Sequence, residues 1–129
     1  MEIVRSAFAA ADRDDMDGIL RLCDEDIVVI QPPDLPGVSR EQRGHGGVLE
    51  AFSIWPEQWD DYRIELLKIA AARGAKIFVS TRTSGRGKQS GVEVSMDFSF
   101  VFTITDGKIS EWRLFTQEAQ ALEAAGLSE

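Results

Sequence analysis

Three polar residues have side chains suited to acid–base chemistry or to holding an anion: Asp34, His45 and Arg82. His45 is the only histidine, and histidine is the side chain whose ordinary pKa lies nearest neutrality. Asp34 lies in a proline-rich stretch and could act as a general base if the fold removes it from water. Arg82 could bind an anionic group. Together these residue types could move a proton on a bound organic molecule.

Each of these residues also has a plainer interpretation. His45 could point to solvent or satisfy a loop, and Arg82 could pair with one of the acidic residues. Asp97 falls opposite an aromatic strand face, which favours an exposed or dimer-facing carboxylate. A lone histidine does not provide the histidine-rich spacing of a zinc site, so we expect no metal, and we also expect no cofactor.

The stretch from Ser90 to Thr116 organises the chain. Asp106-Gly107 predicts a hairpin turn, because glycine accepts a positive φ without steric cost. In the first arm the even-numbered residues from Val92 to Phe102 are apolar and share one face. We expect that face to be either filled core or the wall of a ligand cavity lined by Gln31, Trp55, Trp59, Met96, Phe98, Phe100, Trp112 and Leu114.

The remaining segments supply a cover for this aromatic face. Apolar spacing predicts helices over 3–11, 16–23 and 48–59, and a final helix over 117–125 that Thr116 could cap and Gly126 could end. Alternation and β-branched residues predict strands over 27–30, 62–69 and 75–84. Helices followed by a run of strands indicate an α+β fold. We expect a cone-shaped, curved antiparallel (mixed) sheet wrapped around the N-terminal helices.

Composition limits the partners. The 129 residues suit a single domain over residues 1–129, and the net charge of −8 argues against nucleic acid or an anionic membrane as a partner. No apolar run approaches the ~20 residues that span a bilayer, and the first residues lack the pattern of a signal peptide. Cys23 cannot form an internal disulfide, and its apolar neighbours predict a buried, unreactive thiol. We therefore expect a cytoplasmic protein.

Four motifs carry a resemblance to a known family. They are Gly44-His45-x-Gly47-Val48, the run 90–94, the run 101–109 and the ending 121–127. In these stretches the chain resembles the nuclear transport factor 2-like superfamily and, within it, the SnoaL-like polyketide cyclase group. The resemblance covers nearly the whole chain and implies the same cone-shaped fold. The family contains cyclases, isomerases, dehydratases, epoxide hydrolases and members without known activity, so the fold alone does not give the reaction.

Two signatures of this superfamily are not intact here. A likeness to ketosteroid isomerase would need a tyrosine and two aspartates, but the corresponding positions fall near Ala7, Gln31 and Phe98. The small epoxide hydrolases of this fold carry a catalytic aspartate on the last strand, where this chain has Leu114. Neither activity is therefore expected.

Two hypotheses follow. The first is an acid–base enzyme of cyclase or isomerase type, acting on a small hydrophobic molecule with Asp34, His45 or Arg82 as polar participants. The alternative is a non-catalytic ligand-binding or dimerisation module of the same fold. We also expect a homodimer through the sheet face, because Val101, Phe115 and part of the neighbouring strand leave an apolar patch on the outer side.

Overall fold

A computed structural model describes residues 2–13, 15–31, 41–49, 59–71 and 74–127. The main feature is a six-stranded sheet in the order β2-β1-β6-β5-β4-β3. β1 pairs with β6 in parallel and all other neighbours pair antiparallel. The strands are β1 (Cys23–Ile30), β2 (Glu41–Arg43), β3 (Trp59–Ala71), β4 (Lys76–Gly87), β5 (Glu93–Thr105) and β6 (Lys108–Phe115).

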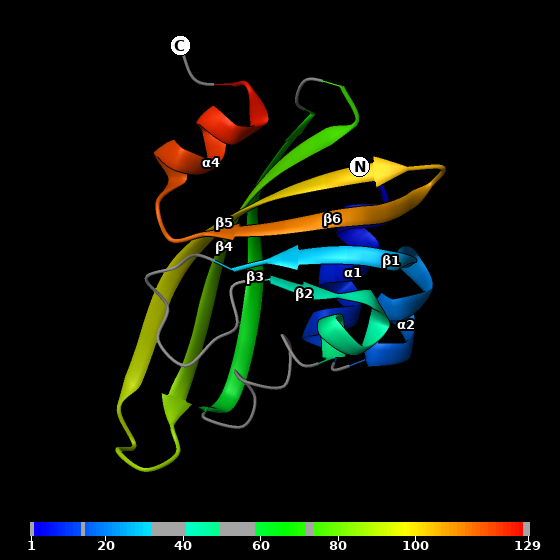
Figure 1. Cartoon of the computed structure of the whole chain (residues 1–129). Coiled ribbons are helices and arrows are strands. Elements are labelled where there is room, and N and C mark those ends of the chain that lie inside the picture. Colours follow the sequence, from blue (N-terminus) through cyan, green and yellow to red (C-terminus); the bar gives the residue numbers. More distant parts are fainter. Residues whose placement is uncertain (1, 14, 32–40, 50–58, 72–73, 128–129) are drawn as a thin grey trace.

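The sheet curls around two N-terminal helices without closing, which confirms the predicted α+β cone (Figure 1). In α1 (Glu2–Asp12), Val4 and Phe8 stand four residues apart and both are buried. α2 (Met16–Leu22) is preceded by the N-cap residue Asp15, whose Oδ1 accepts a hydrogen bond from the backbone N–H of Gly18 at 3.0 Å. That hydrogen bond lowers the pKa of Asp15, with a smaller contribution from Arg13.

The β5–β6 hairpin follows the predicted pattern. Asp106 and Gly107 form the turn with φ of 52° and 79°, and two consecutive positive φ values characterise the tight turn that suits twisted strands. Phe98, Phe100 and Phe102 lie on the concave face and are buried in the main core. The alternation that predicted one aromatic face therefore holds in the part of β5 that the helices cover.

The final helix, α4 (Glu118–Ala125), packs on the outer face of the sheet. It covers a second, smaller core whose buried members are Phe78, Val101, Phe115, Ala121 and Ala125. Our expectation that Val101 and Phe115 form an exposed apolar patch is therefore wrong. Val101 interrupts the polar alternation of β5 because this helix covers that part of the outer face.

The ends of α4 differ in how well they were predicted. Gln117, rather than Thr116, occupies the N-cap position, and its side chain makes no capping hydrogen bond. Gly126 adopts φ of 77°, and the backbone N–H of Leu127 donates to the carbonyl oxygen of Leu122 at 2.8 Å. This is the predicted glycine-terminated helix end.

Three element boundaries differ from the sequence prediction. β1 begins at Cys23 instead of residue 27, so Cys23 belongs to a strand and not to the helix before it. β2 was not predicted, because three polar residues have no strand signal of their own. Trp59 begins β3 and does not continue a helix from residue 48, although residues 44–49 are helical.

Candidate functional site

One end of the concave face is filled by aromatic side chains. The ring of Phe8 lies 5.5 Å from that of Phe100 and 5.8 Å from that of Phe102, measured between centroids. Trp112 lies 6.0 Å from Phe100 and 5.7 Å from Phe102. The apolar cavity left between α1, α2 and these strands measures about 10 Å³, roughly the space of a single water. Phe100 and Trp112, both predicted to line a pocket, are packed core in this part of the structure.

The buried polar side chains of the described residues carry no charge. They are Gln31, Gln42, Thr81, Thr83 and Ser99. The hydroxyl of Thr81 donates to the carbonyl oxygen of Phe98 at 3.1 Å, so it is satisfied within the sheet. Thr81 and Thr83 pair in register with Phe98 and Met96, which places both threonines on the concave face. This face therefore offers amide and hydroxyl groups beside the predicted pocket residues Met96, Phe98 and Leu114.

Gln31 and Gln42 bring two carboxamides to neighbouring strands. Gln42 pairs in register with Val29, and Gln31 follows Val29 by two residues. Alternation places all three side chains on one face, and Gln31 and Gln42 are 5% and 7% exposed. Diagonal neighbours of this kind have Cα atoms about 7–8 Å apart, within reach of long side chains. The two amides can therefore contact one small molecule.

The side-chain oxygen of Gln42 is buried and has no hydrogen-bond partner among the described residues. Close packing holds the backbone here, because a Cβ atom at Gly47 would lie 3.0 Å from both the Cβ and the carbonyl carbon of Gln42. An unpaired buried acceptor is rare in folded proteins and calls for a physical explanation. Sequence reasoning missed Gln42, since only its pairing with Val29 turns it inward.

His45 makes a structural contact. Its Nε2 lies 3.1 Å from the backbone oxygen of Cys23, at the junction of α2 and β1. Nε2 must carry the proton to donate to that carbonyl. This contact agrees with the interpretation in which His45 provides a hydrogen bond to the backbone near the end of a helix.

Arg82 lies on the outer face, opposite Asp97 in register. Its Nε donates to Oδ1 of Asp97 at 2.9 Å, and a second nitrogen reaches Oδ2 at 3.4 Å. The hydrogen bond with Asp97 raises the pKa of Arg82, and the nearby carboxylate charges add to that effect. Arg82 therefore pairs with one acid of the protein itself, on the side of β4 opposite Thr81 and Thr83.

The other predicted site residues divide as follows. Asp34 and Trp55 lie outside the described residues, and for Trp59 the structure describes only the backbone. Burial raises the pKa of the Cys23 thiol from 9.0 to about 11, in agreement with the predicted unreactive cysteine. The described residues hold no cluster of three metal-binding side chains. No helix among them is long and apolar enough to cross a bilayer.

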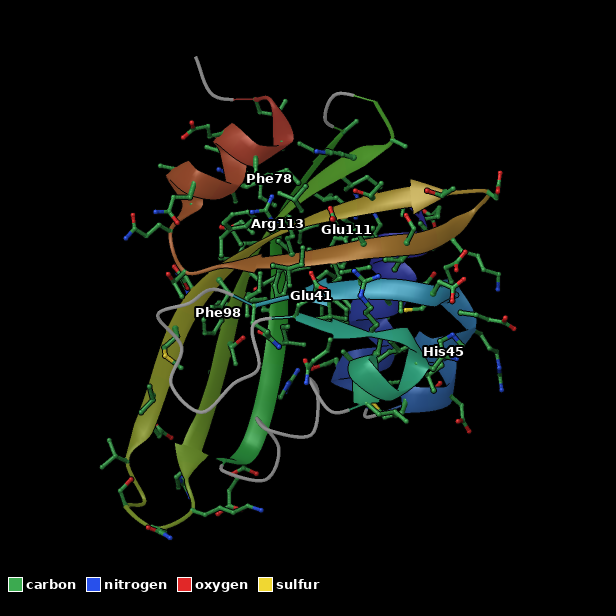
Figure 2. All side chains as sticks on the ribbon, viewed as in Figure 1. Glu41, His45, Phe78, Phe98, Glu111 and Arg113 are labelled. Carbon is green, nitrogen blue, oxygen red and sulfur yellow. The ribbon has the colours of Figure 1, made fainter. Side chains whose placement is uncertain are left out.

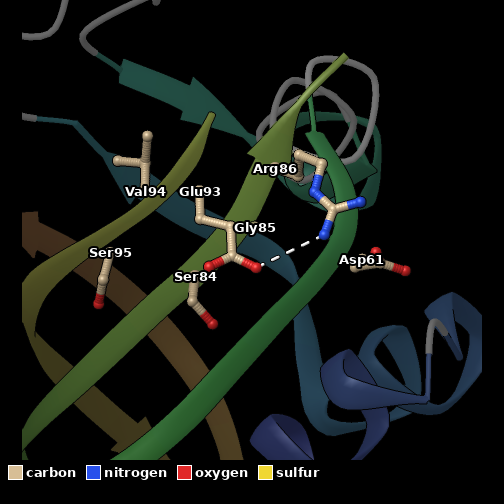
Figure 3. A pocket seen from close by; sticks show the side chains of 7 residues that line it. All are labelled: Asp61, Ser84, Gly85, Arg86, Glu93, Val94 and Ser95. Atoms are coloured by element: carbon tan, nitrogen blue, oxygen red, sulfur yellow. Dashed lines mark hydrogen bonds and ion pairs between the residues drawn. The ribbon is translucent and has the colours of Figure 1, made fainter. Parts of the chain in front are cut away.

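Two open depressions lie beside the sheet. One, of about 610 Å³, runs between α1, β3 and β4 and is lined in part by Arg5, Phe8, Asp12, Arg63 and Arg82. The other, of about 450 Å³, lies at the far ends of β3, β4 and β5, where Arg86 and Glu93 approach to 3.5 Å (Figure 3). In both depressions, charged side chains form ion pairs with each other. In the larger one, Nε of Arg63 lies 3.3 Å from Oδ1 of Asp12. We do not place the candidate site in either.

The family model of the SnoaL-like domain matches residues 4–112. The chain belongs to the SnoaL-like domain family. The resemblance found in the sequence is thereby confirmed. A search of the curated proteins found no match for this SnoaL-like chain.

Solved structures share the fold. An NTF2-like protein of unknown function from Burkholderia pseudomallei is 19% identical, with a TM-score of 0.80 over 97% of this chain and 95% of its own. TerC, co-crystallised with polyporic acid, is 20% identical, with a TM-score of 0.79 over 98% and 97%. A candidate polyketide cyclase from Sinorhizobium meliloti is 24% identical, with a TM-score of 0.71 over 89% and 94%. At such identities the likeness establishes the fold of this SnoaL-like chain and leaves its ligand open.

Proposed function

We propose that this SnoaL-like chain binds a small, mainly apolar molecule with a hydrogen-bond donor, on the concave face beside Gln31 and Gln42. The observation that carries the proposal is the buried oxygen of Gln42, which accepts no hydrogen bond from the described residues. An unsatisfied buried acceptor costs about 1–3 kcal/mol. A ligand hydroxyl or N–H at this oxygen would remove that cost.

The surrounding residues suit such a ligand. Met96, Phe98 and Leu114 supply apolar surface on the same face, and few polar groups accompany them. Small-molecule sites commonly combine an apolar wall with a small number of fixed polar groups. The co-crystal of TerC with polyporic acid supports a small organic ligand for a chain of this fold.

The proposed reaction is proton transfer of cyclase or isomerase type. The buried polar groups of the described residues are amides and hydroxyls, which can hold and orient a ligand but do not ionise near neutral pH. A general base must then come from another segment, and Asp34, three residues after Gln31, is our candidate. A candidate polyketide cyclase among the structural neighbours supports this class of chemistry.

A second function, ligand binding without turnover, is favoured by that same uncharged set of buried groups. Turnover of a screened substrate separates the two functions, and replacement of Asp34 by Asn in such a preparation tests the proposed base. An enzyme with this base loses turnover and keeps its ligand affinity. Unchanged turnover removes Asp34 from the mechanism.

Binding at the proposed place is tested by titrating 2-naphthol, an aromatic probe with one hydroxyl, into isotope-labelled protein. We expect NMR shifts in the side-chain NH₂ groups of Gln31 and Gln42 and in the methyl group of Met96. Shifts confined to Arg5 and its neighbours beside α1, or no saturable shifts at all, would contradict the proposal.

A further inference from the structure

Two buried threonines on the concave face of β4 differ in whether their hydroxyls are satisfied. The hydroxyl of Thr81 donates to the carbonyl oxygen of Phe98 at 3.1 Å, and Thr81 is 0% exposed. The hydroxyl of Thr83 makes no hydrogen bond with the described residues, and Thr83 remains 6% exposed. A side-chain hydroxyl that is so deeply buried normally has a partner. Thr83 can therefore bond to a molecule that lies on the concave face.

Thr83 is well separated from the two buried glutamines. Gln31 directly follows β1 and lies beside Leu114 of β6, which pairs with Phe100 of β5. Thr83 pairs with Met96, four residues before Phe100. Three strand spacings of ~4.8 Å and four residue rises of ~3.3 Å separate Gln31 from Thr83 by roughly 20 Å in a flat sheet. The curl of the sheet and the inward side chains shorten this distance, but one small ring does not span it.

The surface between the two polar places is apolar. Met96, Phe98 and Leu114 lie there on the concave face and belong to the main core or pack against it. Phe98 lies at the point where β5 runs on beyond the end of β6 (Figure 2). The charged pair nearest to Thr83 in the register, Arg82 with Asp97, faces the outer side of the sheet.

We propose that Thr83 is a second polar contact of the ligand site, and that the ligand is an elongated, uncharged molecule with a hydrogen-bonding group at each end. This inference rests on the function proposed above, in which a ligand donor bonds to the oxygen of Gln42. A threonine hydroxyl both donates and accepts, so it suits an oxygen at the far end of the ligand. The buried polar groups of the described residues are all uncharged, and a charged end group would lose its hydration without gaining a counter-ion there. Multi-ring aromatic diols belong to the class of ligand that fits.

The chain supplies matched variants for the test. T83V removes the unpartnered hydroxyl and keeps the shape of the side chain, whereas T83S keeps the hydroxyl. T81V makes the same chemical change two residues away on the same face, where the hydroxyl is already bonded to the protein. In urea unfolding, T81V should therefore have a lower midpoint than the wild type, and T83V should not.

The decisive measurement is the affinity, by isothermal titration calorimetry, for one probe with a single hydroxyl and two probes with a hydroxyl at each end. The first is 4-hydroxybiphenyl, and the diols are 4,4′-dihydroxybiphenyl and the longer 4,4′-dihydroxystilbene. T83V should bind 4-hydroxybiphenyl within twofold of the wild type and lose roughly fivefold in affinity for at least one diol, because one hydrogen bond is removed. T83S and T81V should bind that diol as the wild type does.

The outcomes separate this inference from the proposed function. If T83V loses affinity for neither diol, or loses as much for 4-hydroxybiphenyl as for the diols, Thr83 is not a ligand contact and the inference is overturned. The proposed function then still stands. A wild type that binds none of the three probes would overturn both.

Discussion

Gln31 and Gln42 lie on the same face beside two adjacent strands, and each is more than nine-tenths buried. Among the described residues, the other buried groups on that face are apolar residues and threonines. The pairing of Gln42 with Val29 creates this arrangement, because it turns the middle residue of a three-residue strand inward. Of these two neutral amides, Gln31 lies near one of the positions where the resemblance to ketosteroid isomerase would require an aspartate. Such a site would orient a ligand by hydrogen bonds.

His45 should matter for stability and not for ligand binding. H45L removes the donor to the carbonyl oxygen of Cys23, and the loss of one partly buried hydrogen bond should lower the free energy of unfolding by about 1 kcal/mol. H45Q, which keeps a donor, should lose less. Urea unfolding measures the stability, and a naphthol titration of the same variants should show unchanged affinity. A variant that loses affinity for the naphthol but keeps its stability would show that His45 takes part in ligand binding.

Because its thiol is buried, Cys23 should lower the free energy of unfolding at alkaline pH. Its folded pKa of about 11 lies above the unfolded value of 9.0, so its contribution is complete below pH 9 and is lost as the pH rises toward 11. Two pKa units correspond to roughly 2–3 kcal/mol. The difference in unfolding free energy between wild type and C23A isolates this effect, because other groups titrate in both proteins. A difference that is the same at pH 8 and pH 10.5 would contradict the burial of the thiol.

Phe78 should anchor α4 to the outer face. It is 1% exposed in the smaller core, and truncation of a buried phenylalanine costs about 3–5 kcal/mol. F78A should therefore lower the midpoint of thermal unfolding by many degrees. L67A is the control, since Leu67 is 43% exposed. Equal stability of the two variants would mean that α4 does not cover this part of the sheet.

Arg82 should be dispensable for the proposed ligand. Its guanidinium pairs with Asp97 on the outer face, whereas the amides lie on the concave face. We expect R82Q to bind 2-naphthol within twofold of the wild type by isothermal titration calorimetry. A tenfold loss would show that the outer face takes part in binding.

The sequence predicts most of the fold because its signals are local. The apolar alternation around Phe100, the Asp106-Gly107 turn and the glycine after α4 each act within a few residues. The site is harder to predict because it depends on pairing between distant segments. The residues around Gln42 give no local signal that its side chain is buried. Alternation places Arg82 and Thr81 on opposite faces of β4, but only the register with β5 shows which of these faces is the concave one. The final helix covers Val101 for the same non-local reason.

The central claim is that the oxygen of Gln42 accepts a hydrogen bond from a ligand. The direct measurement compares the affinities of 2-naphthol and 2-methoxynaphthalene, which lacks the donor, for the wild type, Q42L and Q120L. Gln120 is an exposed residue of α4, so Q120L repeats the chemical change away from the site. We predict that wild type and Q120L prefer the naphthol by roughly tenfold, and that Q42L has no preference. An equal preference in all three proteins, or none in the wild type, would contradict the account.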